Sequence, residues 1–188
     1  MKRALFISIV MLFSAAALRA QDHGAVTRPE APPPKSITYT SPEGRYAVTL
    51  SQQPTLSSQN ITAASGDPLV QFMASAPIGS LGLAMIGYFD YPTTVVFSLD
   101  EARNGMVKSL NGTLMGEEAI SLGGSPGRAI KIAAKTESGI DFIDRSRFYD
   151  VNRRIYVLQC LIPKANDSDS AAQTCEQFFD SFRVKKSQ

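Results

Sequence analysis

From residue 36 onward, short runs of apolar or alternating apolar and polar residues are separated by turn residues, which is typical of a β-rich domain. Ser41-Pro42-Glu43-Gly44 has the residues of a tight turn between the first two runs. The expected strands occupy residues 37–40, 46–50, 56–63, 69–76, 83–91, 114–122, 128–135, 140–149 and 154–162.

Two segments have a helical period instead. Ser98 and Glu101 form a capping box, and apolar residues follow at positions 99, 102, 106 and 110, on one helical face. A second helix is expected after Ser170, where Gln173 completes another capping box and Cys175 lies on the apolar stripe. The sequence therefore predicts one helix in the middle of the chain and one near its end.

The expected strand 154–162 is apolar on both faces, with Gln159 as its one clearly polar interruption. A strand of an antiparallel sheet usually has one solvated face, so a strand that is apolar on both needs cover on each side. We therefore predict an α+β fold in which helices flank an antiparallel β-sheet, as an α/β/α sandwich.

The beginning of the chain has the pattern of an export signal. Lys2 and Arg3 precede an uncharged apolar run over residues 4–18, and the small residue Ala20 offers a cleavage position. The alternative is an uncleaved anchor, but the run is shorter than the roughly 20 residues that span a bilayer. We predict a signal peptide (1–20), a Pro-rich disordered spacer (21–35) and a single domain (36–188), with no membrane span after cleavage and a periplasmic or secreted location.

Removal of the leader changes the charge of the protein. The whole chain has 19 Lys and Arg residues against 17 Asp and Glu residues, and loss of Lys2, Arg3 and Arg19 leaves 16 against 17. A nearly neutral domain without a long basic run gives no electrostatic reason to bind nucleic acid.

Cys160 and Cys175 are the two cysteines of the chain. One lies on the final expected strand and the other on the buried stripe of the returning helix, so a disulfide between them is geometrically feasible. Export would supply an oxidising compartment. Their spacing is not that of a redox pair, and no nearby histidine completes a zinc site. We predict a structural disulfide, with two buried free thiols or a reactive pair as alternatives.

The domain offers no constellation for catalysis. The single histidine, His23, lies in the spacer, so serine or cysteine chemistry would lack its usual base. Asp141, Asp144 and Asp150 are a weak metal signal, and we expect them to be solvated surface acids. We predict no catalytic residue, no metal and no cofactor, and hence a protein that is not an enzyme.

One polar strand face is a candidate binding surface. If strands 128–135 and 140–149 pair across the turn between them, Lys131 lies opposite Arg145, and Arg147 and Tyr149 continue the same face. These four residues could meet an acidic partner or ligand. The alternative, which we favour, is a solvated and partly salt-bridged surface.

The order of these pieces resembles a known family. The segments "YTSPEGRYAVTL", "YFDYP", "GGSPGRAIKI", "RSRFYDVNRRIYVL" and "FFDSF" are similar to those of bacterial exported proteins related to PsbP, the extrinsic subunit of the photosystem II oxygen-evolving complex. The resemblance covers residues 36–184. It implies an antiparallel sheet flanked by helices and a non-catalytic accessory or binding role, and none of the family's metal ligands can be matched.

Two functions of different class follow. The first is an exported, non-catalytic interaction or assembly-accessory protein with a protein partner in the cell envelope, and we prefer it. The alternative is an extracytoplasmic small-ligand-binding protein, or an atypical hydrolase, that uses the groove between sheet and helix.

Overall fold

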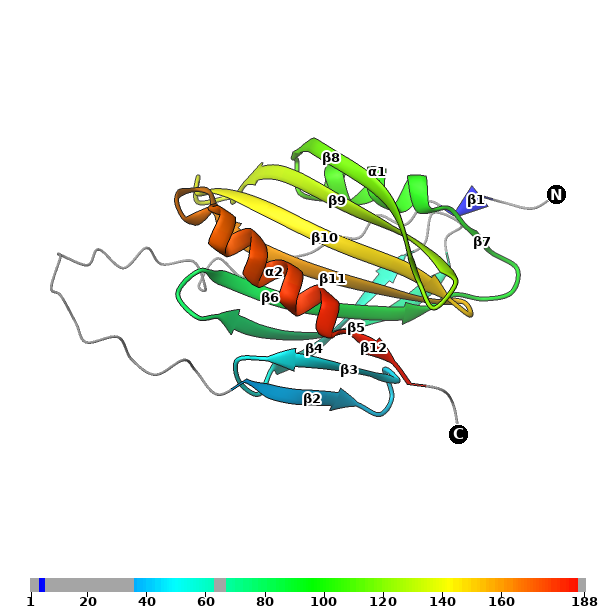
Figure 1. Cartoon of the computed structure of the whole chain (residues 1–188). Coiled ribbons are helices and arrows are strands. Elements are labelled where there is room, and N and C mark those ends of the chain that lie inside the picture. The colour runs from blue at the N-terminus through cyan, green and yellow to red at the C-terminus, as the bar shows by residue number, and fades with distance from the viewer. Residues whose placement is uncertain (1–3, 6–35, 63–66, 186–188) are drawn as a thin grey trace, which may run out of the picture.

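A computed structural model describes residues 4–5, 36–62 and 67–185 of the chain. Its larger sheet is antiparallel and has seven strands (Figure 1). In spatial order they are β4 (Thr55–Thr62), β5 (Pro68–Ile78), β6 (Gly82–Asp90), β11 (Arg154–Pro163), β10 (Asp141–Val151), β9 (Ser125–Lys135) and β8 (Thr113–Leu122).

A smaller sheet lies beside it. Its three strands are β12 (Arg183–Val184), β3 (Tyr46–Leu50) and β2 (Ile37–Ser41), in that order. The short strand β1 (Ala4–Leu5) pairs in parallel with β7 (Val96–Phe97). The helices are α1 (Leu99–Ser109), α2 (Asp169–Ser181) and the 3-10 turn η2 (Lys164–Asn166). The first hairpin therefore belongs to a second sheet that the sequence did not predict.

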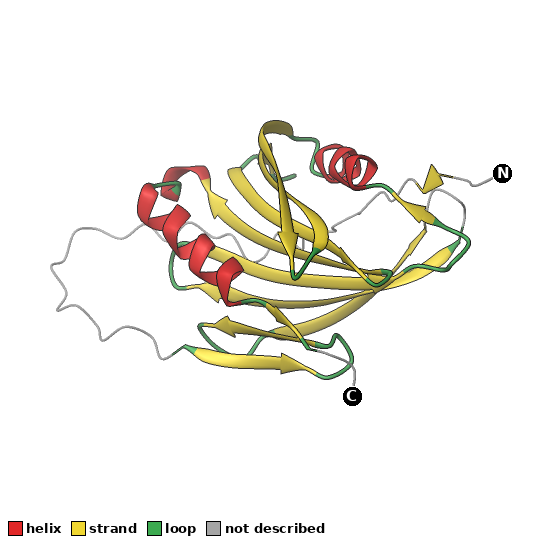
Figure 2. Ribbon diagram, turned by 45° about the vertical axis from the view of Figure 1, so that its right-hand side comes forward, coloured by secondary structure: helices red, strands yellow, loops and turns green. Residues whose placement is uncertain are grey.

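The central strand β11 is buried on both faces, as its pattern predicted. Ile155 and Val157 pack in one hydrophobic cluster with Met106 of α1. Tyr156 packs in another cluster with Phe178 of α2. The two helices thus lie against opposite faces of the larger sheet, and Figures 1 and 2 show α2 crossing the strands on one side.

The predicted α+β fold with an antiparallel sheet is confirmed. The finer α/β/α layering stays a prediction, because α2 shares its side of the sheet with the smaller sheet. Tyr46, Val48 and Leu50 of β3 belong to the same cluster as Phe178 of α2.

The predicted start of the second helix was wrong by two residues. Ser168 has an extended backbone and its hydroxyl accepts the Ala171 N–H at 3.2 Å, so Ser168 is the cap and the helix begins at Asp169. Ser170, the predicted cap, lies within the first turn, where its carbonyl accepts the Thr174 hydroxyl.

Strand β9 begins three residues before its predicted start. Gly123 and Gly124 have φ values of 56° and 85°, so these two residues alone make the turn. A two-residue hairpin turn with positive φ at both positions fits the right-handed twist of the strands that it joins. Pairing therefore resumes at once, with Ser125 opposite Leu122.

The predicted signal peptide (1–20) and spacer (21–35) lie outside the described residues, apart from the two residues of β1. Within the described part of the chain, neither helix has the length and apolar character needed to cross a bilayer.

Candidate functional site

The predicted register of the polar strand face is confirmed. Lys131 on β9 lies opposite Arg145 on β10, and Lys135 lies opposite Asp141 beside the turn. We call Lys131, Arg145 and Arg147 the cationic face. Their side chains extend toward the side of the sheet that carries α2, where they meet carboxylates.

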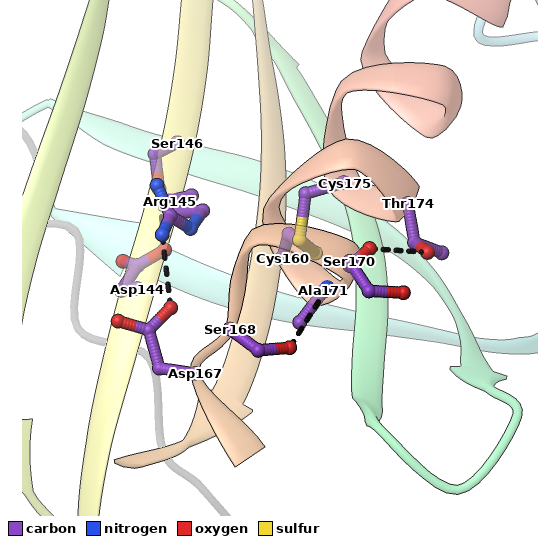
Figure 3. Close-up of a disulfide and its surroundings, with 10 residues drawn as sticks. All are labelled: Asp144, Arg145, Ser146, Cys160, Asp167, Ser168, Ser170, Ala171, Thr174 and Cys175. Carbon is purple, nitrogen blue, oxygen red and sulfur yellow. Dashed lines mark hydrogen bonds and ion pairs between the residues drawn. A yellow bond between two sulfur atoms is a disulfide. The ribbon is translucent and has the colours of Figure 1, made fainter.

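Asp167 pairs with two of these cations. It follows η2, and its carboxylate accepts a hydrogen bond from Lys131 at 3.3 Å. The same carboxylate accepts a second hydrogen bond, from Arg145 at 2.9 Å, which Figure 3 shows. Burial by itself raises the pKa of Asp167, but the hydrogen bonds and positive charges of Arg145 and Lys131 outweigh it, so the pKa lies below its usual value. The repulsion between the two facing cations is thereby offset within the chain.

Arg147 is held by α2. Its guanidinium donates to Asp180 at 2.9 Å and to Glu176, and it lies over the ring of Phe179 at 5.0 Å. The ring contributes a cation–π contact in addition to the two carboxylates. Each cation of the cationic face therefore has a carboxylate partner in its own chain.

Tyr149 lies on the same side of β10 but is buried, with only 5% of its surface exposed. Burial raises the pKa of its phenol. Its ring lies over Gly127, the residue opposite it on β9, where a Cβ atom would come within 2.5 Å of the ring. Tyr149 is therefore a core residue rather than an exposed contact.

A cleft of about 260 Å³ lies between α2 and the strands β8, β9 and β10, and it contains the cationic face. An anionic ligand in this cleft would have to displace Asp167 or Glu176 from its cation. The ion pairs of the cationic face resemble the salt-bridged surface that we favoured from the sequence. Binding of an acidic partner stays a prediction.

Asp144 differs from the expectation of a solvated acid, because it is fully buried. Its carboxylate accepts the Ser146 hydroxyl at 2.6 Å and the Gln159 side-chain amide at 3.0 Å. Burial raises its pKa to about 6, against the lowering effect of these two hydrogen bonds. The Oε1 atom of Gln159 has no hydrogen-bond partner among the described residues.

The three acids of β10 do not converge. Asp141 pairs with Lys135 at 3.5 Å, and Asp150 accepts the hydroxyl of Tyr91 at 2.7 Å. Among the described residues, no three His, Cys, Asp or Glu side chains gather as metal ligands would.

The predicted disulfide is present. Cys160 on β11 and Cys175 on α2 are bonded, with their Cα atoms 5.8 Å apart and both residues fully buried (Figure 3). The bond fixes the middle of α2 against the central strand.

Strand β4 is an edge of the larger sheet, and it pairs only with β5 among the described strands. Its eight residues, TLSSQNIT, include no charged residue and no proline. Leu56 on β4 is 63% exposed, and Val70 and Phe72 on β5 are each 44% exposed. Leu56 pairs with Ala74, so these two side chains lie on the same face of the sheet. Val70 and Phe72 lie on that face too, because they are four and two residues from Ala74 on β5 and side chains alternate along a strand. We call this surface the β4 edge patch.

The opposite edge, β8, has features that hinder pairing with another strand. Its register shifts between Leu114 and Gly116, and Glu117 forms ion pairs with Arg103 at 2.6 Å and Arg128 at 2.9 Å. Bulges and charges of this kind protect exposed edges from further strands. The β4 edge has neither among its described residues.

A second concave surface lies on the other side of α2 from the cationic face. It is a groove of about 440 Å³ between α2, the end of β3 and the turn that joins β5 to β6. Leu50, Ile78, Leu81 and Phe178 are among the apolar residues that line it. Sequence reasoning anticipated a groove between sheet and helix, but not that the smaller sheet forms one wall.

Comparison with solved structures identifies a protein of similar fold. No protein-family model matches the sequence, and no curated protein matches it. The solution structure of cyanobacterial PsbP (CyanoP) from Synechocystis sp. PCC 6803 superposes with a TM-score of 0.56 at 11% identity, over 85% of this chain and 98% of that one. The chain has a PsbP-like fold.

A second solved structure is less similar. The crystal structure of a Pseudomonas aeruginosa protein of unknown function has a TM-score of 0.39 at 11% identity, over 81% of this chain and 99% of that one.

At 11% identity the likeness to PsbP concerns the fold alone. The predicted resemblance to PsbP is thus confirmed as a resemblance of fold.

Proposed function

We propose that this PsbP-like protein is an exported, non-catalytic accessory protein that binds an extended strand of another cell-envelope protein at the β4 edge patch. The observation that carries the proposal is the combination of an uncharged edge strand, which pairs with no described strand other than β5, with the exposed side chains of Leu56, Val70 and Phe72.

The edge strand supplies the affinity for such a partner. An edge strand presents unpaired N–H and C=O groups, and an added strand satisfies them while its side chains settle on the neighbouring surface. Proteins normally protect a long edge strand from pairing with another chain, as the charge of Glu117 and the bulge do on β8. The absence of such protection among the described residues of β4 is therefore better explained by a partner strand than by chance.

The apolar side chains supply the specificity. Phe72 stacks on Tyr88 with their ring centroids 5.1 Å apart, so the phenylalanine is held in place while 44% of its surface stays exposed. A fixed, half-exposed aromatic ring is a typical anchor of protein interfaces. Because β4 carries no charge, the chemistry that fits it is an uncharged strand with apolar residues on the side facing Phe72.

Several observations support the remaining parts of the proposal. The signal-like sequence of residues 1–20 and the buried disulfide both suit an oxidising compartment outside the cytoplasm. The domain from residue 36 onward has no histidine to act as a base.

The experiment is co-purification of the tagged full chain from its own host, with two matched variants. Leu56→Lys places a charge on the β4 edge patch, and Met115→Lys places the same charge at an equally exposed position on β8, where the native side chain is 60% exposed. Both variants should fold, because surface substitutions usually change stability by less than about 0.5 kcal/mol.

We expect a protein that co-purifies with the wild type and with Met115→Lys to be lost in Leu56→Lys. Equal recovery of every co-purifying protein with the two variants would contradict the proposal. A partner identified as a second copy of this chain would also contradict it, since the edge would then mediate self-association.

A further inference from the structure

The groove of about 440 Å³ beside α2 has the size of a small-molecule site, for which volumes of roughly 300–1,000 Å³ are typical. Its floor is apolar and includes Leu50, Ile78 and Ala84. Hydroxyl and amide groups lie around its rim, among them those of Ser80 and Gln177. An apolar floor with a few polar groups at the rim is the usual composition of a ligand pocket.

The residues that line the groove include no charged side chain. This matters because the cleft on the other side of α2 is densely charged, with Arg147 bound by Glu176 and Asp180. The helix therefore separates a charged cleft from a neutral groove. A charged ligand in the groove would lose hydration without gaining an ionic partner, which is costly.

The disulfide holds one wall of this groove in place. Cys175 lies on α2 next to Thr174 and close to Phe178, both of which line the groove. Its partner Cys160 lies directly opposite Ala84 in the register of β11 and β6, and Ala84 is part of the floor. The bond therefore ties the helical wall to the strand beside the floor, so that the groove exists before any ligand arrives.

We propose that this groove binds a small, uncharged, mainly apolar molecule that carries one hydrogen-bonding group, and that the Cys160–Cys175 disulfide keeps the site preformed. The apolar part lies along Leu50, Ile78 and Phe178, and the polar group reaches the amide of Gln177 or the hydroxyl of Ser80. Neither of these two side chains has a hydrogen-bond partner within the described part of the chain, so both are available. The proposal is independent of strand binding at the β4 edge patch.

The test uses three probes of equal chain length, decanol, decanoate and decylammonium, with the purified disulfide-bonded protein. Displacement of the uncharged dye Nile red measures affinity, and native mass spectrometry gives the stoichiometry. We expect one decanol per chain, bound at least about tenfold more tightly than either ion, because the groove offers no counter-charge.

Two variants on α2 make the test specific to the groove. Gln177→Lys places a cation at the rim, whereas Gln173→Lys places the same cation one turn earlier, outside the groove. We expect decanoate to bind about tenfold more tightly to Gln177→Lys than to the wild type, and Gln173→Lys to behave as the wild type does. Both positions are exposed, so neither change should disturb folding.

The disulfide is tested with the double variant Cys160→Ala/Cys175→Ala, once circular dichroism shows that it is folded. We expect weaker binding of decanol than in the wild type. Equal affinities for the three probes, or the same probe preference in Gln177→Lys and Gln173→Lys, would overturn the proposal. A dimer that decanol dissociates would also overturn it, because a second copy would then occupy the groove.

Discussion

Arg145 on β10 and Asp167 beyond η2 form an ion pair at 2.9 Å. The same carboxylate also binds Lys131, which lies opposite Arg145 on the neighbouring strand β9. Two like charges on neighbouring strands are thereby tolerated, because one acid bridges them. The segment that follows the central strand thus neutralises a face that the sequence alone presents as basic.

Asp167→Asn should lower the free energy of unfolding at pH 7 by about 1 kcal/mol, since partly exposed ion pairs contribute little. The pKa of Asp167 is lowered in the folded protein, so its contribution is present above the usual aspartate pKa and is lost as the pH falls through the folded value. Urea unfolding at pH 7 and at pH 2.5 measures this.

The control for this change is Glu137→Gln, which removes an equal charge from an exposed turn. We expect the control to be neutral at both pH values, and the difference in stability between Asp167→Asn and the wild type to be smaller at pH 2.5 than at pH 7. A pH-independent loss in Asp167→Asn would show that its charge is not the cause.

Reduction of the disulfide should destabilise the domain by about 3 kcal/mol, the chain-entropy estimate for a loop of this size. Cys160 and Cys175 are separated by 15 residues. Urea unfolding of the wild type with and without reductant measures the loss. Cys160→Ala/Cys175→Ala serves as the control, because reductant should leave its unfolding midpoint unchanged. An unchanged midpoint in the wild type would contradict the structural role of the bond.

The buried carboxyl of Asp144 should make stability fall as the pH rises. Its pKa is raised from 3.8 to about 6 in the folded protein, so its stabilising effect is fully present below pH 3.8 and is lost as the pH rises through 6. The loss amounts to about 3 kcal/mol, because each pKa unit corresponds to about 1.4 kcal/mol.

Asp144→Asn isolates this effect, because asparagine has a similar shape and does not titrate. If the amide of Gln159 turns over, its Oε1 can accept a hydrogen bond from the introduced asparagine side chain, so packing is preserved. The stability of the variant relative to the wild type should rise between pH 4 and pH 7.5 in urea unfolding. A relative stability that is constant with pH would argue against a buried titrating carboxyl.

Gly127→Ala should destabilise the domain by about 1–3 kcal/mol, the usual cost of overpacking. A Cβ atom there would lie 2.5 Å from the carbonyl oxygen of Phe148 and 2.5 Å from the ring of Tyr149. Gly116→Ala is the matched control on β8, because nothing lies within 4 Å of a Cβ atom at that position. Thermal unfolding of both variants tests the close approach, and equal melting temperatures would refute it.

Local alternation was enough to predict the pairing of β9 and β10. Because side chains alternate with a period of two and the connecting turn is short, placing Lys135 opposite Asp141 fixes Lys131 opposite Arg145. The disulfide followed from similar reasoning, since Cys160 and Cys175 each lie on a face that had to be buried.

The same alternation could have revealed the burial of Asp144. It has the same parity on β10 as Phe142 and Phe148, which lie in the core, and Ser146 between them supplies a hydrogen bond. Its position beside other acids suggested a solvated surface instead. The parity was the stronger signal.

Contacts between distant segments could not be predicted. Strand β12 has only two residues, Arg183 and Val184, which is too short for any periodic signal, yet it completes the smaller sheet by pairing with β3. The carboxylates that neutralise Arg147 depend on the direction in which α2 crosses the sheet. The helical pattern defines which side of α2 is buried, but not that direction.

The measurement that tests the central claim most directly is photocrosslinking in the host, with a photoreactive amino acid at Ser58 on β4 or, as a control, at Glu137 in the turn between β9 and β10. Ser58 lies opposite Phe72 at the middle of the β4 edge patch. An accessory protein that binds through this edge predicts one adduct with another envelope polypeptide at Ser58, on a chain that lacks residues 1–20, and none at Glu137. No adduct at Ser58, or the same adducts at both positions, would contradict it.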